Sequence, residues 1–193
     1  SRGLGLQMAH ALGEAGARVM LSARKADELE SAVAGLQTAG IDARWIAADA
    51  AQEADIHRLA DETLERMGDV DILVNNAGAA WGAPFDEFPE SGWDKVVDLN
   101  LKTPFFLTQA LAPMLTAAAT DHLAKVINIA SIDGVSVNPQ ETYSYAASKS
   151  GLIHLTKRMA LRLAQDRIAV SAIAPGAFAS DMNKDARDHG DEV

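Results

Sequence analysis

Residues 126–131 have the sequence Val-Ile-Asn-Ile-Ala-Ser, and residues 145–149 have the sequence Tyr-Ala-Ala-Ser-Lys. The apolar run that ends at Ser131 predicts a buried strand with a hydroxyl at its carboxyl end. Tyr145 and Lys149 are four residues apart at the start of a segment with helical periodicity, which places both side chains on one helix face. A cation beside the phenol favours phenolate and lowers the pKa of Tyr145 from its ordinary value of about 10. These residues therefore predict a site that exchanges a proton with a carbonyl or alcohol oxygen, which Ser131 holds in place.

Strands and helices alternate on both sides of this stretch. Strands are predicted over 17–22, 43–48, 70–74, 125–130 and 168–174. Helices are predicted over 4–14, 26–38, 53–67 and 91–119, with a further helix around Tyr145. Pro104 is expected to break the 91–119 helix and Pro113 to bend it. The order predicts an α/β fold, a Rossmann-type doubly wound parallel sheet with helices on both faces, in a single domain over residues 1–193.

Composition supports a single domain and excludes several kinds of partner. The 193 residues are 48% hydrophobic, which suffices for one substantial core. The sequence has no cysteine, which suits the reducing cytoplasm, where we expect the protein. No apolar run approaches the roughly 20 residues of a membrane span, and the five histidines show no metal-ligand spacing. A net charge of −10 argues against nucleic acid as a partner.

Further motifs accompany Ser131, Tyr145 and Lys149 in a definite order. The chain begins Ser1-Arg-Gly-Leu-Gly5, has Asn75-Asn-Ala-Gly78 after a predicted strand, Asn100 in Asp98-Leu-Asn-Leu, and Pro175-Gly176 near its end. In this order the motifs resemble the short-chain dehydrogenase/reductase family, and within it the 3-oxoacyl-carrier-protein reductases. The resemblance implies an oxidoreductase that moves hydride between a nicotinamide and a carbonyl or secondary alcohol. It also implies that the sequence lacks the family's first strand and its C-terminal elements, so that the domain is truncated at both ends.

The resemblance assigns a role to each of four catalytic residues. Tyr145 is the proton donor or acceptor, and Ser131 positions the substrate oxygen. Lys149 holds the nicotinamide ribose and lowers the pKa of Tyr145. Asn100 lies at a helix kink that holds a water connecting Lys149 to solvent. The cofactor supplies the hydride chemistry, and the protein supplies alignment and the proton.

Cofactor-binding residues are expected in the turns that follow the strands. Glycines before a helix N-terminus let a pyrophosphate approach the backbone, and the turns after later strands would lie along the adenine, its ribose and the nicotinamide. Asp49 has an alternative as a helix-capping residue, and the Asn76 turn has an alternative as a purely structural strand end. The candidates, besides Tyr145 and Lys149, are Ser1, Arg2, Gly3, Leu4, Gly5, Arg24, Asp49, Ala50, Asn76, Ala77, Gly78, Pro175, Gly176 and Ser180.

The residues after the second predicted strand favour NADP(H) over NAD(H). An acidic residue there would bind a ribose 2′-hydroxyl, whereas this chain has Ser22-Ala-Arg24-Lys25, with Arg2 in the glycine turn. Guanidinium groups bind phosphate with good geometry. Solvated charges at a helix start are the alternative interpretation of Arg24 and Lys25.

The substrate is a small-molecule carbonyl or alcohol, and its class is left open between two alternatives. The resemblance favours a 3-oxoacyl compound or a broad range of ketones, with Trp81, Asp133 and Asn138 lining the pocket. The polarity of Asp133 also suits a sugar or polyol. A hypothesis of a different class is a dinucleotide-binding regulator or scaffold without turnover.

Self-association is predicted through the helices that start near Ser91 and Tyr145. Both have apolar stretches wider than one sheet-covering face requires. The family resemblance implies a homodimer or homotetramer with two-fold symmetry. Deeper burial of these helices within one subunit is the alternative.

Overall fold

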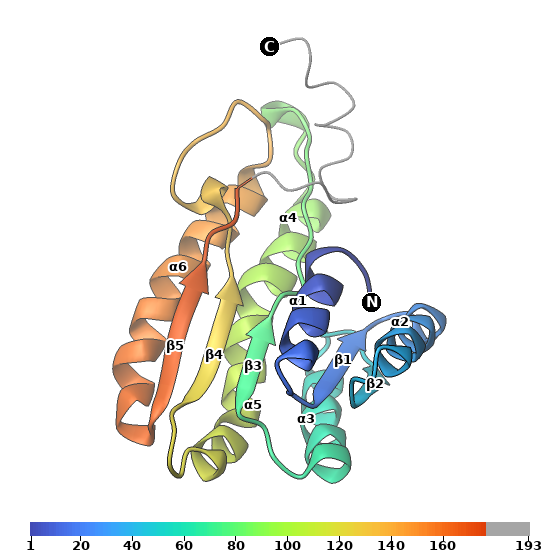
Figure 1. Cartoon of the computed structure of the whole chain (residues 1–193). Helices are drawn as coiled ribbons and strands as arrows, with labels where there is room; N and C mark the ends of the chain where they lie inside the picture. The colour runs from blue at the N-terminus through green and yellow to red at the C-terminus, as the bar shows by residue number, and fades with distance from the viewer. Residues whose placement is uncertain (177–193) are drawn as a thin grey trace.

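The computed structural model describes residues 1–176 of the chain (Figure 1). Helices and strands alternate along it, and a π-helical turn (η2) and short 3-10 turns (η1, η3, η4) join some of them. In chain order the elements are α1 (Gly3–Glu14), β1 (Val19–Ala23), α2 (Ala26–Thr38), β2 (Ala43–Ala47), α3 (Glu53–Met67), β3 (Ile72–Asn75), η1 (Phe85–Glu87), α4 (Glu90–Val97), η2 (Asp98–Lys102), α5 (Thr103–Ala118), β4 (Ala124–Ile129), η3 (Ile132–Gly134), α6 (Tyr143–Leu163), η4 (Ala164–Asp166) and β5 (Ile168–Ile173).

The strands pair only in parallel within residues 1–176, and they form two sheets. β1 pairs with β2, and β4 lies between β3 and β5. Each strand begins and ends within two residues of its predicted bounds. The predicted Rossmann-type α/β fold is confirmed. No strand pairing joins β1 to β3 among these residues, and the strand that the resemblance places before the glycine turn stays a prediction.

Helices cover both faces of the sheets, and each face has its own core (Figure 1). On one face α1 and α2 pack on β1 and β2 through a cluster that includes the fully buried Leu29 and Leu36. On the other face α3 and α5 enclose a larger cluster with Val126 and Leu115 at its centre. The amphipathic periodicity of these helices therefore accounts for the doubly wound arrangement.

The predicted 91–119 helix is irregular at Asn100 and not at Pro104. The structure has α4, the π-helical turn η2 over Asp98–Lys102, and α5, in which Pro104 lies in the first turn. Proline is tolerated there because the first amides of a helix have no partner within it. The prediction of a break near Pro104 is therefore wrong by a few residues, and the irregularity lies at Asn100, where the family resemblance implied a helix kink.

A buried chain of polar side chains ties the sheet to the helices behind it. Asn75 of β3 donates to Asn128 of β4 at 2.8 Å and to Thr108 of α5 at 3.3 Å, and Asn128 donates to Thr156 of α6 at 2.9 Å. All four side chains are buried, so each hydrogen bond compensates for the bonds to water that these polar groups lose on folding. The carboxyl ends of β3 and β4 are thereby held in register with α5 and α6.

Candidate active site

The four predicted catalytic residues meet at the carboxyl edge of β4. Ser131 follows this strand by two residues, Tyr145 and Lys149 lie on the first turns of α6, and Asn100 lies in η2. Crossover topology brings these segments together because α6 returns the chain along the face of the strand it leaves. Open parallel sheets bind ligands at this edge, so the location fits a catalytic role.

Ser131 is held by the tight packing of η3 against α6. It is 7% exposed, and its Oγ accepts a hydrogen bond from the Asp133 amide at 3.2 Å. A Cβ at Gly134 would lie 2.7 Å from the carbonyl carbon of Lys149, so only glycine permits this approach. The close contact keeps the serine hydroxyl beside the first turns of α6.

Lys149 is buried beneath the catalytic turn. Its side chain is 4% exposed, and its Nζ donates to the carbonyl oxygen of Ile129 at 2.7 Å. The Nζ atom lies 5.5 Å from the centre of the Tyr145 ring. Burial disfavours the ammonium and lowers the pKa of Lys149 to about 8.

Tyr145 has a raised pKa, not the lowered one expected from the sequence. Burial raises its pKa, hydrogen bonding with Ser131 opposes that effect, and the charge of Asp133 adds to it. The expectation that Lys149 lowers this pKa is wrong for this chain without a ligand. Lys149 is not among the causes of the shift; its ammonium lies over the ring, 5.5 Å from the ring centre, and donates to the Ile129 carbonyl. The phenol is therefore protonated at neutral pH and can donate a proton.

Asn100 joins the turn after β3 to α6. Its Oδ1 accepts from the Ala79 amide at 2.8 Å, and its Nδ2 donates to the Ala79 carbonyl at 2.9 Å and to Ser148 Oγ at 3.1 Å. Ser148 in turn donates to the Tyr145 carbonyl at 2.8 Å. The Asn100 side chain, which is 1% exposed, thus links the turn after β3 to α6. The predicted water at the helix kink stays a prediction.

The turn after β3 and the start of α1 approach each other closely. A Cβ on Gly5 would lie 2.6 Å from Asn76 Nδ2, and a Cβ on Gly78 would lie 3.2 Å from Asn100 Oδ1 and 3.6 Å from Lys149 Nζ. Ala77 is exposed between these glycine-dependent contacts. The Asn76–Gly78 turn therefore extends from the α1 N-terminus to the catalytic residues, which a dinucleotide would also have to do.

The glycine turn has the geometry expected for phosphate binding. Gly3 has a φ of +58°, and the first amides of α1 have no side-chain cap. Leu4 lies in the first turn, and Arg2 precedes it in an extended conformation. Free amides at a helix N-terminus attract anions. The hydroxyl of Ser1 is less available for a phosphate, because its Oγ donates to Glu28 at 3.0 Å.

Arg24 and Lys25 differ in their freedom to bind a ligand. Arg24 is exposed just after β1 and has no hydrogen bond or ion pair with residues 1–176. Lys25 donates to Glu28 at 2.7 Å. Arg24 is therefore the better candidate for a ribose phosphate, and Lys25 fits the alternative of a helix-start charge.

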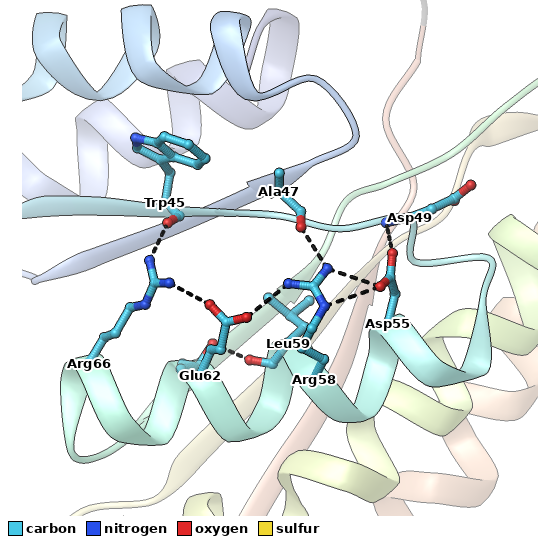
Figure 2. Close-up of polar contacts among 9 residues, drawn as sticks. Trp45, Ala47, Asp49, Asp55, Arg58, Leu59, Glu62 and Arg66 are labelled. Atoms are coloured by element: carbon cyan, nitrogen blue, oxygen red, sulfur yellow. Dashed lines mark hydrogen bonds and ion pairs between the residues drawn. The ribbon is translucent and has the colours of Figure 1, made fainter.

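Asp49 and Ala50 form the turn between β2 and α3 (Figure 2). Asp49 Oδ1 accepts from the Ala51 amide at 3.2 Å, and its own amide donates to Asp55 Oδ2 at 2.7 Å. The Ala50 carbonyl accepts from Thr103 Oγ1 at 2.6 Å. Asp49 does cap its turn locally, but its Oδ2 accepts no hydrogen bond from the described part of the chain.

The predicted pocket residues are distributed unevenly around Tyr145. Asp133 is close enough for its charge to affect the phenol. Asn138 accepts from the Gln140 amide at 2.8 Å and so shapes its own loop. Trp81 packs on α4, where a Cβ at Gly92 would lie 2.7 Å from the indole, and Lys95 Nζ lies 5.3 Å from the indole centre. Trp81 is thus at the rim and partly committed to packing.

The segment after β5 lies against the catalytic serine loop. The Pro175 carbonyl accepts from the Ile132 amide at 2.9 Å. Gly176 ends the described residues, and Ser180 lies outside them. Pro175 and Gly176 are therefore placed at the same sheet edge as Ser131, as predicted.

Three residues of the site were missed from the sequence: Ser148, Thr103 and Asp55. Ser148 lies within the Tyr-x-x-x-Lys motif, so its buried helix position was a usable signal. Thr103 contacts the carbonyl of Ala50, which is distant in the sequence, and Asp55 contacts the Asp49 amide across a turn, so neither contact follows from a local sequence pattern.

Residues 1–176 contain neither a metal-binding cluster nor a membrane-spanning helix. No group of His, Cys, Asp and Glu side chains there has the arrangement of a metal site. No helix in that range is long and apolar enough to cross a bilayer.

Comparisons with known proteins agree with this geometry. The family model for short chain dehydrogenases matches residues 1–191. A rhamnolipids biosynthesis 3-oxoacyl-[acyl-carrier-protein] reductase of Pseudomonas aeruginosa is 42% identical over 185 residues, which are 95% of this chain and 72% of the relative. Among solved structures, the Pseudomonas aeruginosa RhlG/NADP active-site complex superposes with a TM-score of 0.94 at 40% identity, over 98% of this chain and 74% of the other. A gluconate 5-dehydrogenase from Burkholderia cenocepacia in complex with NADP and tartrate gives 0.90 at 32% identity, over 98% and 73%.

Proposed function

The chain belongs to the short-chain dehydrogenase family, and we propose that it is an NADP(H)-dependent oxidoreductase acting on a 3-oxoacyl compound or a related ketone. The observation that carries the proposal is the convergence of the buried Ser131 and Lys149 with the half-buried Tyr145 at the carboxyl edge of β4. A protonated phenol next to a serine hydroxyl suits a substrate oxygen that gains or loses a proton.

Each catalytic side chain has a role that follows from its contacts. NADPH, when bound, supplies the hydride that reduces the carbonyl carbon. Ser131 donates a hydrogen bond to the substrate oxygen, and Tyr145 transfers its proton to that oxygen. Lys149 binds ribose hydroxyls and replaces the proton, and its pKa of about 8 allows it to exchange protons near neutral pH. Asn100 holds Ala79 and Ser148 in place around these groups.

NADP(H) is proposed over NAD(H) because a guanidinium is free where the ribose phosphate would lie. Arg24 follows β1 with no partner among residues 1–176. The two solved relatives described above contain NADP. The Gly3–Gly5 turn and the turn over 76–78 would hold the pyrophosphate and ribose between Arg24 and the catalytic residues.

Replacing Arg24 with aspartate is expected to shift the cofactor preference toward NAD(H). The substitution removes a phosphate partner and adds a repulsive charge, so the ratio of kcat/KM for NADPH to that for NADH should fall at least about tenfold. Lys25→Asp is the matched control, because Lys25 already pairs with Glu28 and should change the ratio little. Equal ratios in wild type and Arg24→Asp would return Arg24 to a solvated surface charge.

The test of the proposed function is oxidation of NADPH, followed by absorbance, with a panel of ketones. Rapid turnover of 3-oxoacyl thioesters, with little on keto sugar acids, would support the proposed substrate class. The charge of Asp133 beside Tyr145 favours the sugar or polyol alternative, for which the reverse order is expected. Nucleotide binding without turnover on any member of the panel would instead favour a regulator.

Self-association through α5 and α6 is proposed from their exposed apolar side chains. Phe105 and Phe106 of α5 are 38% and 37% exposed, and Leu161 of α6 is 76% exposed. We expect light scattering to give a dimer or tetramer at micromolar concentration, and Phe105→Glu to lower that mass. Leu123→Glu, at an exposed position after α5, should leave it unchanged. A monomeric wild type would contradict the interface.

A further inference from the structure

A line of charged side chains on α3 ends at the turn that contains Asp49 (Figure 2). Asp55, in the first turn of α3, accepts the Asp49 amide on Oδ2 at 2.7 Å. Its other oxygen, Oδ1, accepts two bonds from Arg58, from Nε at 3.2 Å and from Nη2 at 2.9 Å. The carboxylate therefore uses both oxygens, one on the turn and one on a guanidinium that fixes its orientation.

The rest of this line fastens α3 to the outer edge of β2 and does not reach Asp49. Arg58 Nη2 also donates to the Ala47 carbonyl at 2.7 Å, and Arg66 Nη1 donates to the Trp45 carbonyl at 3.0 Å. Glu62 lies between the two arginines and pairs with both. These bonds satisfy β2 carbonyls that do not face β1. Glu62 shares the charge and helix of Asp55 but has no contact with the turn.

The backbone of the Asp49 turn is held by two side chains, neither of which bonds the Asp49 carboxylate. Besides the Asp55 bond, Thr103 Oγ1 holds the Ala50 carbonyl at 2.6 Å. In Figure 2 the Asp49 side chain extends away from the charged line. Its Oδ2 has no hydrogen-bond donor among the described residues, so that oxygen is available for a donor on a ligand.

We propose that Asp55 is a positioning residue, which sets the Asp49 carboxylate for the adenine half of the dinucleotide. The inference rests on the proposed function. The hydride must arrive beside Ser131 and Tyr145, so the nicotinamide half occupies the β4 side. The other half then extends toward β1 and β2 (Figure 1), and Asp49 follows β2 by two residues. A carboxylate fits the amino-group donor of adenine. Asp55 is set for this role because its pKa is lowered, first by the Asp49 amide and then by Arg58, which keeps it an acceptor at neutral pH.

The test compares Asp55→Asn with Glu62→Gln in the full chain, using NADPH and reduced nicotinamide mononucleotide, which lacks the adenine half. In asparagine an NH2 group replaces one of the two carboxylate oxygens, so a donor would face either Arg58 or the Asp49 amide. For Asp55→Asn, we expect the Kd of NADPH to rise about tenfold and the Kd of the mononucleotide to stay within about twofold. The KM for NADPH should rise in parallel while kcat stays within about twofold. Glu62→Gln breaks pairs on the same helix and should leave both Kd values close to wild type.

A double-mutant cycle separates an effect of Asp55 through Asp49 from a loss of stability in either variant. If Asp55 acts through Asp49, then Asp55→Asn should cost little further NADPH affinity in an Asp49→Ala background. Arg58→Gln, which removes the group that orients Asp55, should raise the NADPH Kd by an intermediate factor. Three results would overturn this inference and leave the proposed function intact. They are an equal rise in Kd for NADPH and the mononucleotide, an equal rise in Asp55→Asn and Glu62→Gln, and additive effects of Asp55→Asn and Asp49→Ala. A wild-type chain that bound no NADPH would overturn the proposed function and this inference with it.

Discussion

Replacement of Tyr145 by phenylalanine is expected to lower kcat for ketone reduction by about a thousandfold while leaving the Kd of NADPH within about twofold of wild type. The phenol is the proton donor, and phenylalanine keeps the ring that lies beneath Lys149 Nζ. The hydroxyl acts on the reacting oxygen only in the chemical step, so its loss should affect turnover and not docking. Single-turnover rates and NADPH fluorescence titration measure the two quantities separately.

Tyr143→Phe is the matched control for this result. Tyr143 lies two residues earlier on α6, is 37% exposed, and donates its hydroxyl to Glu141 Oε1 at 3.1 Å. Its removal should leave kcat near the wild-type value. A Tyr145→Phe enzyme with more than about a tenth of wild-type turnover would remove Tyr145 from the role of acid.

The raised pKa of Tyr145 determines which direction of the reaction the free side chain favours. Burial keeps the phenol protonated through neutral pH, so the donor for reduction is present without any adjustment. Oxidation of an alcohol needs the phenolate. Lys149 donates to the Ile129 carbonyl, and a shift of its ammonium toward the phenol oxygen would stabilise the phenolate.

Local periodicity accounts for the parts of the fold that were predicted from the sequence. The helices over Ala26–Thr38 and Glu53–Met67 have the predicted bounds, because each has an apolar stripe and ends near a glycine. The strands followed from apolar runs between turn residues. Periodicity did not predict the π-helical turn at Asn100, where only the family resemblance implied a helix kink, because the Asn100 side chain is fixed by Ala79 and Ser148, which are distant in the sequence.

For the candidate site too, the sequence predicted which residues take part but not the tertiary surroundings that set their pKa values. The motif order identified Ser131, Tyr145, Lys149 and Asn100, which the structure brings together. Helical spacing correctly placed Lys149 near Tyr145 but could not say which part of the ring it faces. The raised pKa of Tyr145 results from burial, which outweighs the hydrogen bond with Ser131, and from the charge of Asp133, and all three are tertiary features. The contact between Asp55 and Asp49 spans six residues around a turn and needed coordinates for the same reason.

Replacement of Lys149 by methionine is expected to lower activity and to raise the stability of the ligand-free chain. Lys149→Met is expected to lower kcat by about a hundredfold and to weaken NADPH binding, because the ammonium serves both the proton supply and the ribose. The same substitution replaces a buried charged side chain with an uncharged methionine of similar length. We expect the free energy of unfolding of the ligand-free chain at pH 7 to rise by about 2 kcal/mol, which is the desolvation cost less the lost bond to Ile129.

The pH dependence of that gain distinguishes desolvation from better packing. The folded-state pKa of Lys149 is about 8, below the ordinary value of 10.5, so between these pH values the unfolded wild type binds more protons than the folded form. Wild-type stability from this group therefore rises with pH across that window, and its penalty is constant below pH 8. The advantage of Lys149→Met should accordingly be full at pH 7 and shrink as the pH rises toward 10.5. Denaturant unfolding at several pH values measures it, with Lys157→Met, exposed on the same helix, as the control. A gain independent of pH would assign the effect to packing and show that Lys149 is not destabilised by its burial.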